Sequence, residues 1–546
     1  MGDKHDLSRR GFLGAAAGAA AAATVGLGAG SAHAQPGSPG PGGPGGGDLA
    51  LVNGKIHTFD ENNSVVSQVL IRDGRFVNVG SVGGGGGPRT TIDLKGHTVI
   101  PGLIDNHCHF IRIGQAAGYD MRRLETAFSI EALQQIVADY AAEVPEGEFM
   151  TALRGLALRQ WASPARHATI AELDEAAPHH PVVISQGTNG QTNTLGRDRL
   201  RDLGVNVSDT GSVNDDQAYI ALSQFFTIET KKREMLRAAD YALSIGMTGF
   251  IDEHGNVGSP GTAGFLNRVT GHDHILELYR EGRLPVRVRA RFGVNPPNDA
   301  VELLQTYVDH RWENFGDDMF KTAGIGEWAP RGANYQNSLL IMARRPIQYQ
   351  QHLISTGEIQ NHLNALEQFE MANPQFSVAD LYWSGGHMDG MTEAQVAQSN
   401  NLGMGIIPQG WQYLTGNGTG PNFRAIVDLA EVPVGTGSDG ARVAPLNAWS
   451  MIYFMTTGRN SGGALVGEGR SVTREEAIRL YSGPDQGWFS KEEDTFGGVG
   501  VGRYADLAVL AANVFDHNAV PDDALRKMTS VLTIVGGQVR YEAGVL

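Results

Sequence analysis

Two histidines one residue apart close an apolar run in the stretch VIPGLIDNHCHF. Side chains at alternate positions of a strand face the same side, so His107 and His109 point together while Cys108 faces the other way. Two neutral imidazoles that converge at a strand end can bind one divalent cation. Taken alone, however, the pair is equally typical of two histidines in a polar loop.

Other strand-like segments also end in residues that bind metals or transfer protons. His352 stands late in YQQHLIS, His387 closes LYWSGGH, and Asp439 follows the glycine-rich VPVGTGS. Lys321 lies in FKTAGIGEW, where a buried ammonium would be costly unless it is paired or chemically altered. Such residues on successive strand-like segments predict a shared site, which the histidine pair alone does not.

These positions need a scaffold that gathers strand ends. From about residue 99 to residue 483, strand-like and helix-like segments alternate, which predicts a (β/α)8 TIM-like barrel with insertions. In such barrels the chemistry sits at the C-terminal ends of the strands. Nine segments are strand candidates, so at least one lies outside the barrel or is not a strand: TVIPGLIDNH, FMTALRGLAL, PVVISQG, MTGFIDEHG, FKTAGIGEW, IQYQQHLIS, LYWSGGHM, LGMGIIPQG and VPVGTGSD.

Both ends of the chain carry short alternating apolar runs separated by hairpin signals such as NGK, DGR and GG. Each block alone would expose an apolar face. We therefore expect residues 48–98 and 484–546 to pack as one small β-sandwich beside a barrel domain over residues 99–483. The predicted fold class is α/β.

The first residues have the features of a targeting segment. A twin-arginine pair (Arg9, Arg10), an apolar stretch and an Ala-x-Ala ending at Ala34 indicate a twin-arginine export signal over residues 1–34. A membrane anchor is the alternative, but a run dominated by Ala and Gly inserts weakly. We expect export to the periplasm or beyond, with the twin-arginine machinery as a partner in transit. The Pro/Gly-rich residues 35–47 read as a linker.

Composition narrows the class of partner. The 546 residues carry a formal charge of −16, which argues against nucleic acid and favours a small-molecule substrate. A single cysteine excludes an intrachain disulfide and any zinc site built from several thiolates. No segment after the leader is long and apolar enough to span a bilayer. The sequence does not indicate the oligomeric state.

The segment IPGLIDNHCHF, together with Lys321, His352, His387 and the GSD at Asp439, resembles the amidohydrolase superfamily. It is most similar to the amidohydrolase-3 subgroup, which includes N-substituted formamide deformylases. The terminal segments ALVNGKIHTF, GRYADLAVLAANVF and SVLTIVGGQVRY are similar to the flanking β-sandwich of that superfamily. The resemblance implies a metal-dependent hydrolase that acts on a non-peptide C–N bond, in a linear amide or formamide-like substrate.

The same resemblance implies a ligand set for two divalent ions, with zinc as the expected metal. His107 and His109 would bind the more buried ion, and His352 and His387 the more exposed one. Lys321 would be carboxylated to a carbamate that bridges both ions, which removes the problem of a buried ammonium.

The resemblance also implies the catalytic residue. Asp439 would bind the first ion, accept a proton from the bridging water and donate it to the leaving nitrogen. Asp105 lies on the same side of the strand as the two histidines, and it would hold the metal ligands in place without binding metal itself. Cys108 would face the barrel wall as a small apolar residue and not act as a nucleophile.

Several alternatives stay open. Glu327 in GIGEW is a rival to Lys321, because a glutamate can bridge two metals directly. His254 in DEHG could line the site, although a loop histidine is the simpler interpretation. A lactone or ester hydrolase would need the same activated water, and an exported binding protein could keep the barrel without the reaction. Manganese, iron or cobalt could replace zinc, and a single ion could replace two.

Overall fold

The computed structural model describes residues 48–82, 90–152, 155–161, 165–186, 189–253, 272–293, 301–310, 312–328, 334–416, 418–440 and 444–546. The expected export signal and linker lie outside these described residues, as does His254. Within the described ranges, no helix has both the length and the apolar character that crossing a bilayer requires.

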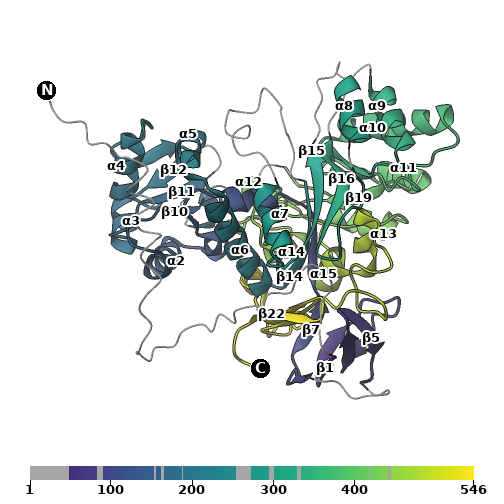
Figure 1. Cartoon of the computed structure of the whole chain (residues 1–546), viewed down its shortest axis with the longest axis horizontal. Coiled ribbons are helices and arrows are strands. Elements are labelled where there is room, and N and C mark those ends of the chain that lie inside the picture. Colours follow the sequence, from purple (N-terminus) through teal and green to yellow (C-terminus); the bar gives the residue numbers. More distant parts are fainter. Residues whose placement is uncertain are drawn as a thin grey trace. The chain divides into compact units, whose positions relative to one another are not determined.

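Seven parallel strands form one sheet that curls into a nearly closed barrel (Figure 1). Their order is β19-β18-β17-β16-β15-β14-β8, so each strand neighbours the next one along the chain. The bounds are β8 (Leu103–Cys108), β14 (Met247–Asp252), β15 (Arg287–Gly293), β16 (Phe320–Trp328), β17 (Tyr349–Leu353), β18 (Ser384–His387) and β19 (Gly405–Pro408). All but β15 fall on predicted strand segments, and β8 runs one residue past the end of its segment.

Residues 432–439, the last of the nine predicted strand segments, form no regular strand. They nevertheless hydrogen-bond to both edges of the sheet, because Gly435 N donates to Ile406 O on β19 at 3.0 Å and Asp439 N donates to His107 O on β8 at 2.9 Å. The glycine-rich sequence here favours this irregular path over a regular strand. Asp439 is thereby brought to the C-terminal end of β8.

Helices alternate with the barrel strands. Many begin with a capping box. In this motif the side chain of the residue before the helix accepts from the backbone N–H of the third helical residue, and the side chain of that third residue accepts from the backbone N–H of the residue before the helix. In α10, Ser355 Oγ accepts from Glu358 N at 3.3 Å and Glu358 Oε2 accepts from Ser355 N at 2.9 Å. The helices are α6 (Ile228–Ser244), α7 (Asp273–Arg280), α8 (Val301–Asp309), α9 (Tyr335–Arg344), α10 (Thr356–Ala372), α11 (Glu393–Leu402), α12 (Gln412–Thr415), α13 (Phe423–Leu429), α14 (Ala448–Thr457) and α15 (Arg474–Ser482).

Two of the predicted barrel strands belong to a different sheet. FMTALRGLAL contains β10 (Met150–Ala152) and PVVISQG contains β11 (Val182–Gln186), and both lie in a five-stranded sheet of order β13-β12-β11-β10-β9. A short apolar run looks the same in any buried sheet, so its pattern cannot indicate which sheet it joins. The other elements of this insertion are β9 (Tyr119–Asp120), β12 (Asn189–Thr192), β13 (Ser212–Asn214), α2 (Ile130–Glu143), α3 (Ile170–Ala176), α4 (Thr194–Asp202) and α5 (Asp215–Leu222).

The two ends of the chain meet in one six-stranded sheet of order β22-β21-β20-β7-β2-β3. A four-stranded sheet of order β5-β4-β1-β6 contributes to the same buried cluster, in which Leu51, Val69, Val99 and Leu507 take part. The predicted β-sandwich stays a prediction. The bounds are β1 (Leu49–Val52), β2 (Lys55–His57), β3 (Val65–Val66), β4 (Val69–Arg72), β5 (Arg75–Val79), β6 (Thr90–Asp93), β7 (Thr98–Pro101), β20 (Leu507–Leu510), β21 (Ser530–Val535) and β22 (Gln538–Glu542).

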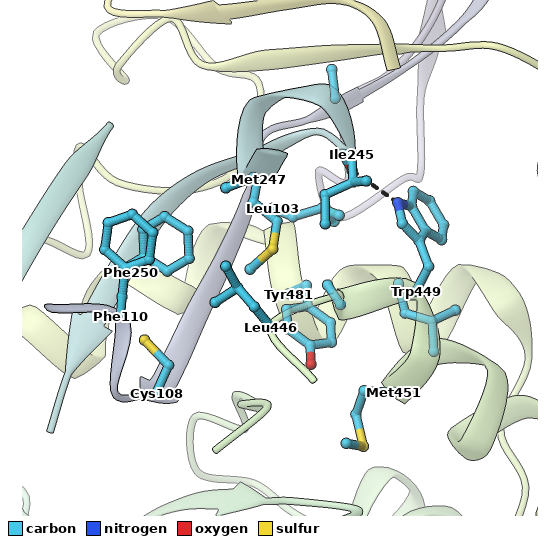
Figure 2. Close-up of a cluster of buried hydrophobic side chains, with 14 of the residues drawn as sticks. Leu103, Cys108, Phe110, Ile245, Met247, Phe250, Leu446, Trp449, Met451 and Tyr481 are labelled. Atoms are coloured by element: carbon cyan, nitrogen blue, oxygen red, sulfur yellow. Dashed lines mark hydrogen bonds between the residues drawn. The ribbon is translucent and has the colours of Figure 1, made fainter. Parts of the chain in front are cut away.

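A large apolar cluster fixes β8 against its neighbours (Figure 2). The rings of Phe110 and Phe250 stack in parallel with their centroids 3.9 Å apart. Trp449 Nε1 donates to the Ile245 carbonyl at 2.8 Å, as the dashed line in Figure 2 marks. Burying such an aromatic ring stabilises the fold by roughly 1.5–3 kcal/mol. The end of β8, where the two histidines stand, is therefore held in a rigid setting.

Candidate metal centre

His107 and His109 stand at the C-terminal end of β8, and both side chains are buried. His107 Nε2 lies 3.7 Å from Glu327 Oε1 and 3.9 Å from Asp439 Oδ1. His109 Nε2 lies 3.5 Å from Glu327 Oε2 and 3.1 Å from Asp439 Oδ1. Two imidazoles and two carboxylates therefore converge on one point, and each offers one atom within 4.8 Å of the others.

A second group shares Glu327 with the first. His352 Nδ1, on β17, lies 3.3 Å from Glu327 Oε1, and His387 Nε2, at the end of β18, lies 3.7 Å from the same oxygen. The three candidate ligand atoms of Glu327, His352 and His387 again lie within 4.8 Å of one another. A carboxylate with two oxygens can serve two cations at once, so this arrangement suits a pair of bridged ions.

Gln350 orients the His107 ring through a contact at Nδ1, the ring nitrogen that faces away from the cluster. Its Oε1 accepts a hydrogen bond from His107 Nδ1, and its own Nε2 donates to the Asn106 carbonyl at 3.3 Å, which fixes which end of the amide faces the ring. With the proton of His107 on Nδ1, the lone pair of Nε2 points into the cluster. Partners of this kind set the tautomer of histidines that bind metals.

Asp105 holds the turn that carries Asp439. Its carboxylate accepts from Ser438 Oγ at 2.5 Å, from Ser438 N at 3.1 Å and from His107 N at 3.1 Å. Asp105 thus accepts from the backbone amides of His107 and Ser438, and so it ties the end of β8 to the residue that precedes Asp439. Burial raises the pKa of Asp105 to about 6.

Three residues of the two groups adopt a backbone conformation that non-glycine residues rarely take. Glu327 has φ 40°, His387 has φ 71° and Asp439 has φ 56°. Each such residue costs roughly 1–3 kcal/mol, and strain of this kind concentrates at functional sites. All three stand at the C-terminal rim of the barrel, where the chain turns each side chain towards the cluster.

Burial and the charges of neighbouring side chains shift the pKa values within the two groups. The pKa of Glu327 lies well below its usual range, because the surrounding histidines, His109 foremost, outweigh the effect of burial. Burial lowers the pKa of His387 to about 3, so its imidazole is neutral, as metal binding requires. Burial raises the pKa of Asp439 to about 8.

The donor atoms also fit a cation. His107 Nε2 and both ring nitrogens of His387 are buried and make no hydrogen bond. An unpaired buried polar atom costs about 1–3 kcal/mol, so several within one cluster need a common partner. Imidazole nitrogens and carboxylate oxygens are the donors that zinc and similar divalent ions prefer. The residues present therefore fit the implied metal pair.

Five of the six residues predicted to bind metal meet in these two groups: His107, His109, His352, His387 and Asp439. The sixth, Lys321, does not. Its Nζ donates to Glu492 Oε1 at 2.6 Å, and Glu492 belongs to neither group. Glu327, the alternative on the same strand, is shared by both groups.

The correction has a simple geometric cause. Strand β16 is nine residues long; Lys321 is its second residue and Glu327 its second to last. At about 3.3 Å per residue, the two positions lie roughly 20 Å apart along the strand. Lys321 therefore stands near the N-terminal end of the barrel, where it needs no carboxylation because Glu492 neutralises it.

Cys108 faces away from the two groups, as strand parity predicts. In Figure 2 its sulfur lies among apolar side chains beside Phe110, and Sγ donates weakly to the Ile251 carbonyl at 3.6 Å. Burial raises the pKa of the thiol well above its usual value. A buried protonated thiol is no nucleophile.

Comparison with known proteins supports a metal-dependent hydrolase. The model of the amidohydrolase family matches residues 90–541. The N-substituted formamide deformylase of Arthrobacter pascens is 23% identical over 567 aligned residues, which cover 91% of this chain and 98% of that protein.

Solved structures of low identity share the fold. An uncharacterized metal-dependent hydrolase of Pyrococcus furiosus gives a TM-score of 0.55 at 19% identity and covers 86% of this chain and 100% of that one. An atrazine chlorohydrolase of Arthrobacter aurescens, solved with zinc, gives a TM-score of 0.53 at 15% identity and covers 90% of this chain and 95% of that one.

Proposed function

The chain belongs to the amidohydrolase family and is a metal-dependent hydrolase; from this premise we propose that it hydrolyses a non-peptide C–N bond in a linear amide or formamide-like substrate. The observation that carries the proposal is the position of Glu327, whose carboxylate is shared by two groups of candidate ligands. The similarity to a formamide deformylase along nearly the whole chain supports the choice of substrate class.

We propose that the centre holds two divalent ions, most suitably zinc. His107, His109 and Asp439 would hold one ion, His352 and His387 would hold the other, and Glu327 would bind both. When bound, the ions would polarise the substrate carbonyl and lower the pKa of a water molecule towards neutrality.

Proton transfer is the step left to the side chains. Without a cation, burial raises the pKa of Asp439 to about 8. A bound cation would lower this pKa, so the carboxylate would be ionised and able to accept a proton. We assign to Asp439 the transfer of a proton from the attacking water to the departing nitrogen. A general acid–base residue works best when its pKa is close to the operating pH.

Turnover of matched substrates tests the proposed bond. The purified zinc-loaded protein is assayed on N-substituted formamides and linear amides, and on lactones and esters of similar size, with chelator-treated protein as the control. We expect kcat/KM to be highest for the amide substrates and to vanish after chelation. Turnover confined to lactones or esters would replace the proposal with an ester hydrolase, and a protein with neither zinc nor turnover would be a binding protein.

We further propose that the protein is exported through the twin-arginine route, on the basis of Arg9, Arg10 and the Ala-x-Ala ending at Ala34. That route carries folded proteins, which suits an enzyme that acquires its metal before leaving the cytoplasm.

A further inference from the structure

Strand β15 carries three buried arginines at alternate positions, each paired with a carboxylate. Arg287 Nε donates to Asp506 Oδ2 at 2.6 Å, and Arg289 Nε donates to Glu492 Oε2 at 2.5 Å. Arg291 Nη1 donates to Glu253 Oε1 at 2.9 Å. Alternate residues of a strand face the same side, so the three ion pairs form a row along the barrel. Arg291 occupies the end of the row nearest the metal centre.

The pair of Arg291 and Glu253 is completely buried, because both side chains have 0% exposure. Arg291 Nη2 also donates to the Phe489 carbonyl at 2.7 Å, which fixes the guanidinium from a second side. Glu253 is the first residue after β14. A buried ion pair is costly to form and is strongly destabilising to break from one side. Nothing in the proposed reaction uses either residue directly.

The second oxygen of Glu253 reaches the backbone of the shared ligand. Glu327 N donates to Glu253 Oε2 at 3.0 Å, at the residue whose φ is 40°. The contact needs a glycine beside it, because a Cβ at Gly326 would lie 2.1 Å from Glu253 Oε2. The register of β16 against β17 shifts between Ile325 and Trp328, which places this contact within an irregular stretch of the strand.

We propose that Arg291 and Glu253 are positioning residues that hold Glu327 in its strained conformation, so that its carboxylate serves both groups of ligands. This inference rests on the proposed metal centre. The guanidinium holds the Glu253 side chain in place, and the second oxygen of that carboxyl group accepts from the Glu327 amide. Without the pair, the peptide of Glu327 is free to relax to an ordinary strand conformation, which would turn its side chain away from the histidines.

Zinc binding tests the proposal without relying on turnover. Glu253→Gln keeps the shape of the side chain but leaves one acceptor oxygen for two donors, and Arg291→Met removes the guanidinium. The control is Arg287→Met, which breaks a nearly as buried pair on the same strand but touches no ligand. For each variant, zinc affinity is measured by competition with a chelator, and thermal unfolding is followed in the presence of chelator.

We expect Glu253→Gln and Arg291→Met to weaken zinc binding roughly 10–100-fold, the usual effect of removing a partner that supports a metal ligand. Arg287→Met should lose thermal stability but keep the zinc affinity of the parent protein. Unchanged zinc affinity in the first two variants, or an equal loss in Arg287→Met, would overturn the proposal.

Arg291→Lys is the mildest change and covers the case in which the other variants fail to fold. Arg291→Lys keeps the charge, and Gly326→Ala places a Cβ against Glu253 Oε2. We expect both variants to bind zinc more weakly than the parent protein. Parent affinity in both would overturn the proposal. Binding by the parent protein is measured first. A parent chain that binds no zinc would refute the metal centre itself, whereas two bound ions with insensitive variants would refute the positioning role alone.

Discussion

Replacing Glu327 with glutamine is expected to lower kcat by about 1,000-fold and to reduce the zinc content of the purified protein. The carboxylate lies between two groups of ligands, and glutamine removes the negative charge that both ions would share. Loss of a supporting partner alone costs roughly 10–100-fold in metal affinity or activity, so loss of a shared ligand should cost more. Elemental analysis and steady-state kinetics on the same preparation measure both effects.

Lys321→Ala on the same strand is the matched control for this prediction. Its ammonium pairs with Glu492, which belongs to neither group of ligands, and it stands at the opposite end of β16 from Glu327, so zinc content and kcat should stay close to those of the parent protein. The opposite pattern would contradict the assignment. If Glu327→Gln keeps both ions while Lys321→Ala loses them and regains activity with short carboxylic acids, a carbamate on Lys321 is the bridge.

Asp439→Asn is expected to keep most of the bound zinc and to lower kcat by roughly 10²–10⁴-fold, the usual contribution of a general acid–base residue. An amide oxygen can still approach a cation, but it cannot carry a proton at the pH of the assay. The reduction should appear in kcat more than in KM, because proton transfer contributes in the transition state.

The zinc content of the Asp439→Asn protein decides how its kinetics are read. A rate within tenfold of the parent protein at full zinc content would refute the role of Asp439 in proton transfer. Parallel loss of zinc and activity, with activity restored by excess zinc, would limit Asp439 to its role as a ligand and assign the proton transfer elsewhere.

Much of the site could be predicted from residue types at strand ends. The C-terminal ends of parallel strands meet at one rim, so His107, His352 and His387 had to converge once the barrel was inferred. His109 follows the last residue of β8 and Asp439 lies in a segment without regular strand, yet hydrogen bonds between the two segments bring both residues to the same rim.

The sequence predicts β16 with its observed bounds, yet it favours Lys321 over the alternative Glu327 as the bridging ligand. Lys321 drew attention as a charged residue in an apolar strand, but the same rule about strand ends favours Glu327. The positive φ of Glu327 and the irregular pairing around it depend on tertiary contacts that no local pattern encodes.

Strand β15 was missed for a related reason. RVRARFG has the alternation of a strand, but its three arginines read as solvent-exposed residues. They are buried because carboxylates distant in the sequence neutralise them, as Asp506 does for Arg287. Pairing between residues 219 positions apart cannot be inferred from one sequence. The roles of Glu253 and Gln350 cannot be predicted from the sequence either, because these residues contact the candidate ligands Glu327 and His107 and are not ligands themselves.

Elemental analysis of the mature protein, purified without chelator and with protein concentration from amino-acid analysis, tests most directly whether side chains from distant strands hold a pair of cations. Two zinc ions, or two ions of a similar divalent metal, are expected per chain. A chain that retains no divalent metal and binds none on addition of zinc would contradict the proposed centre.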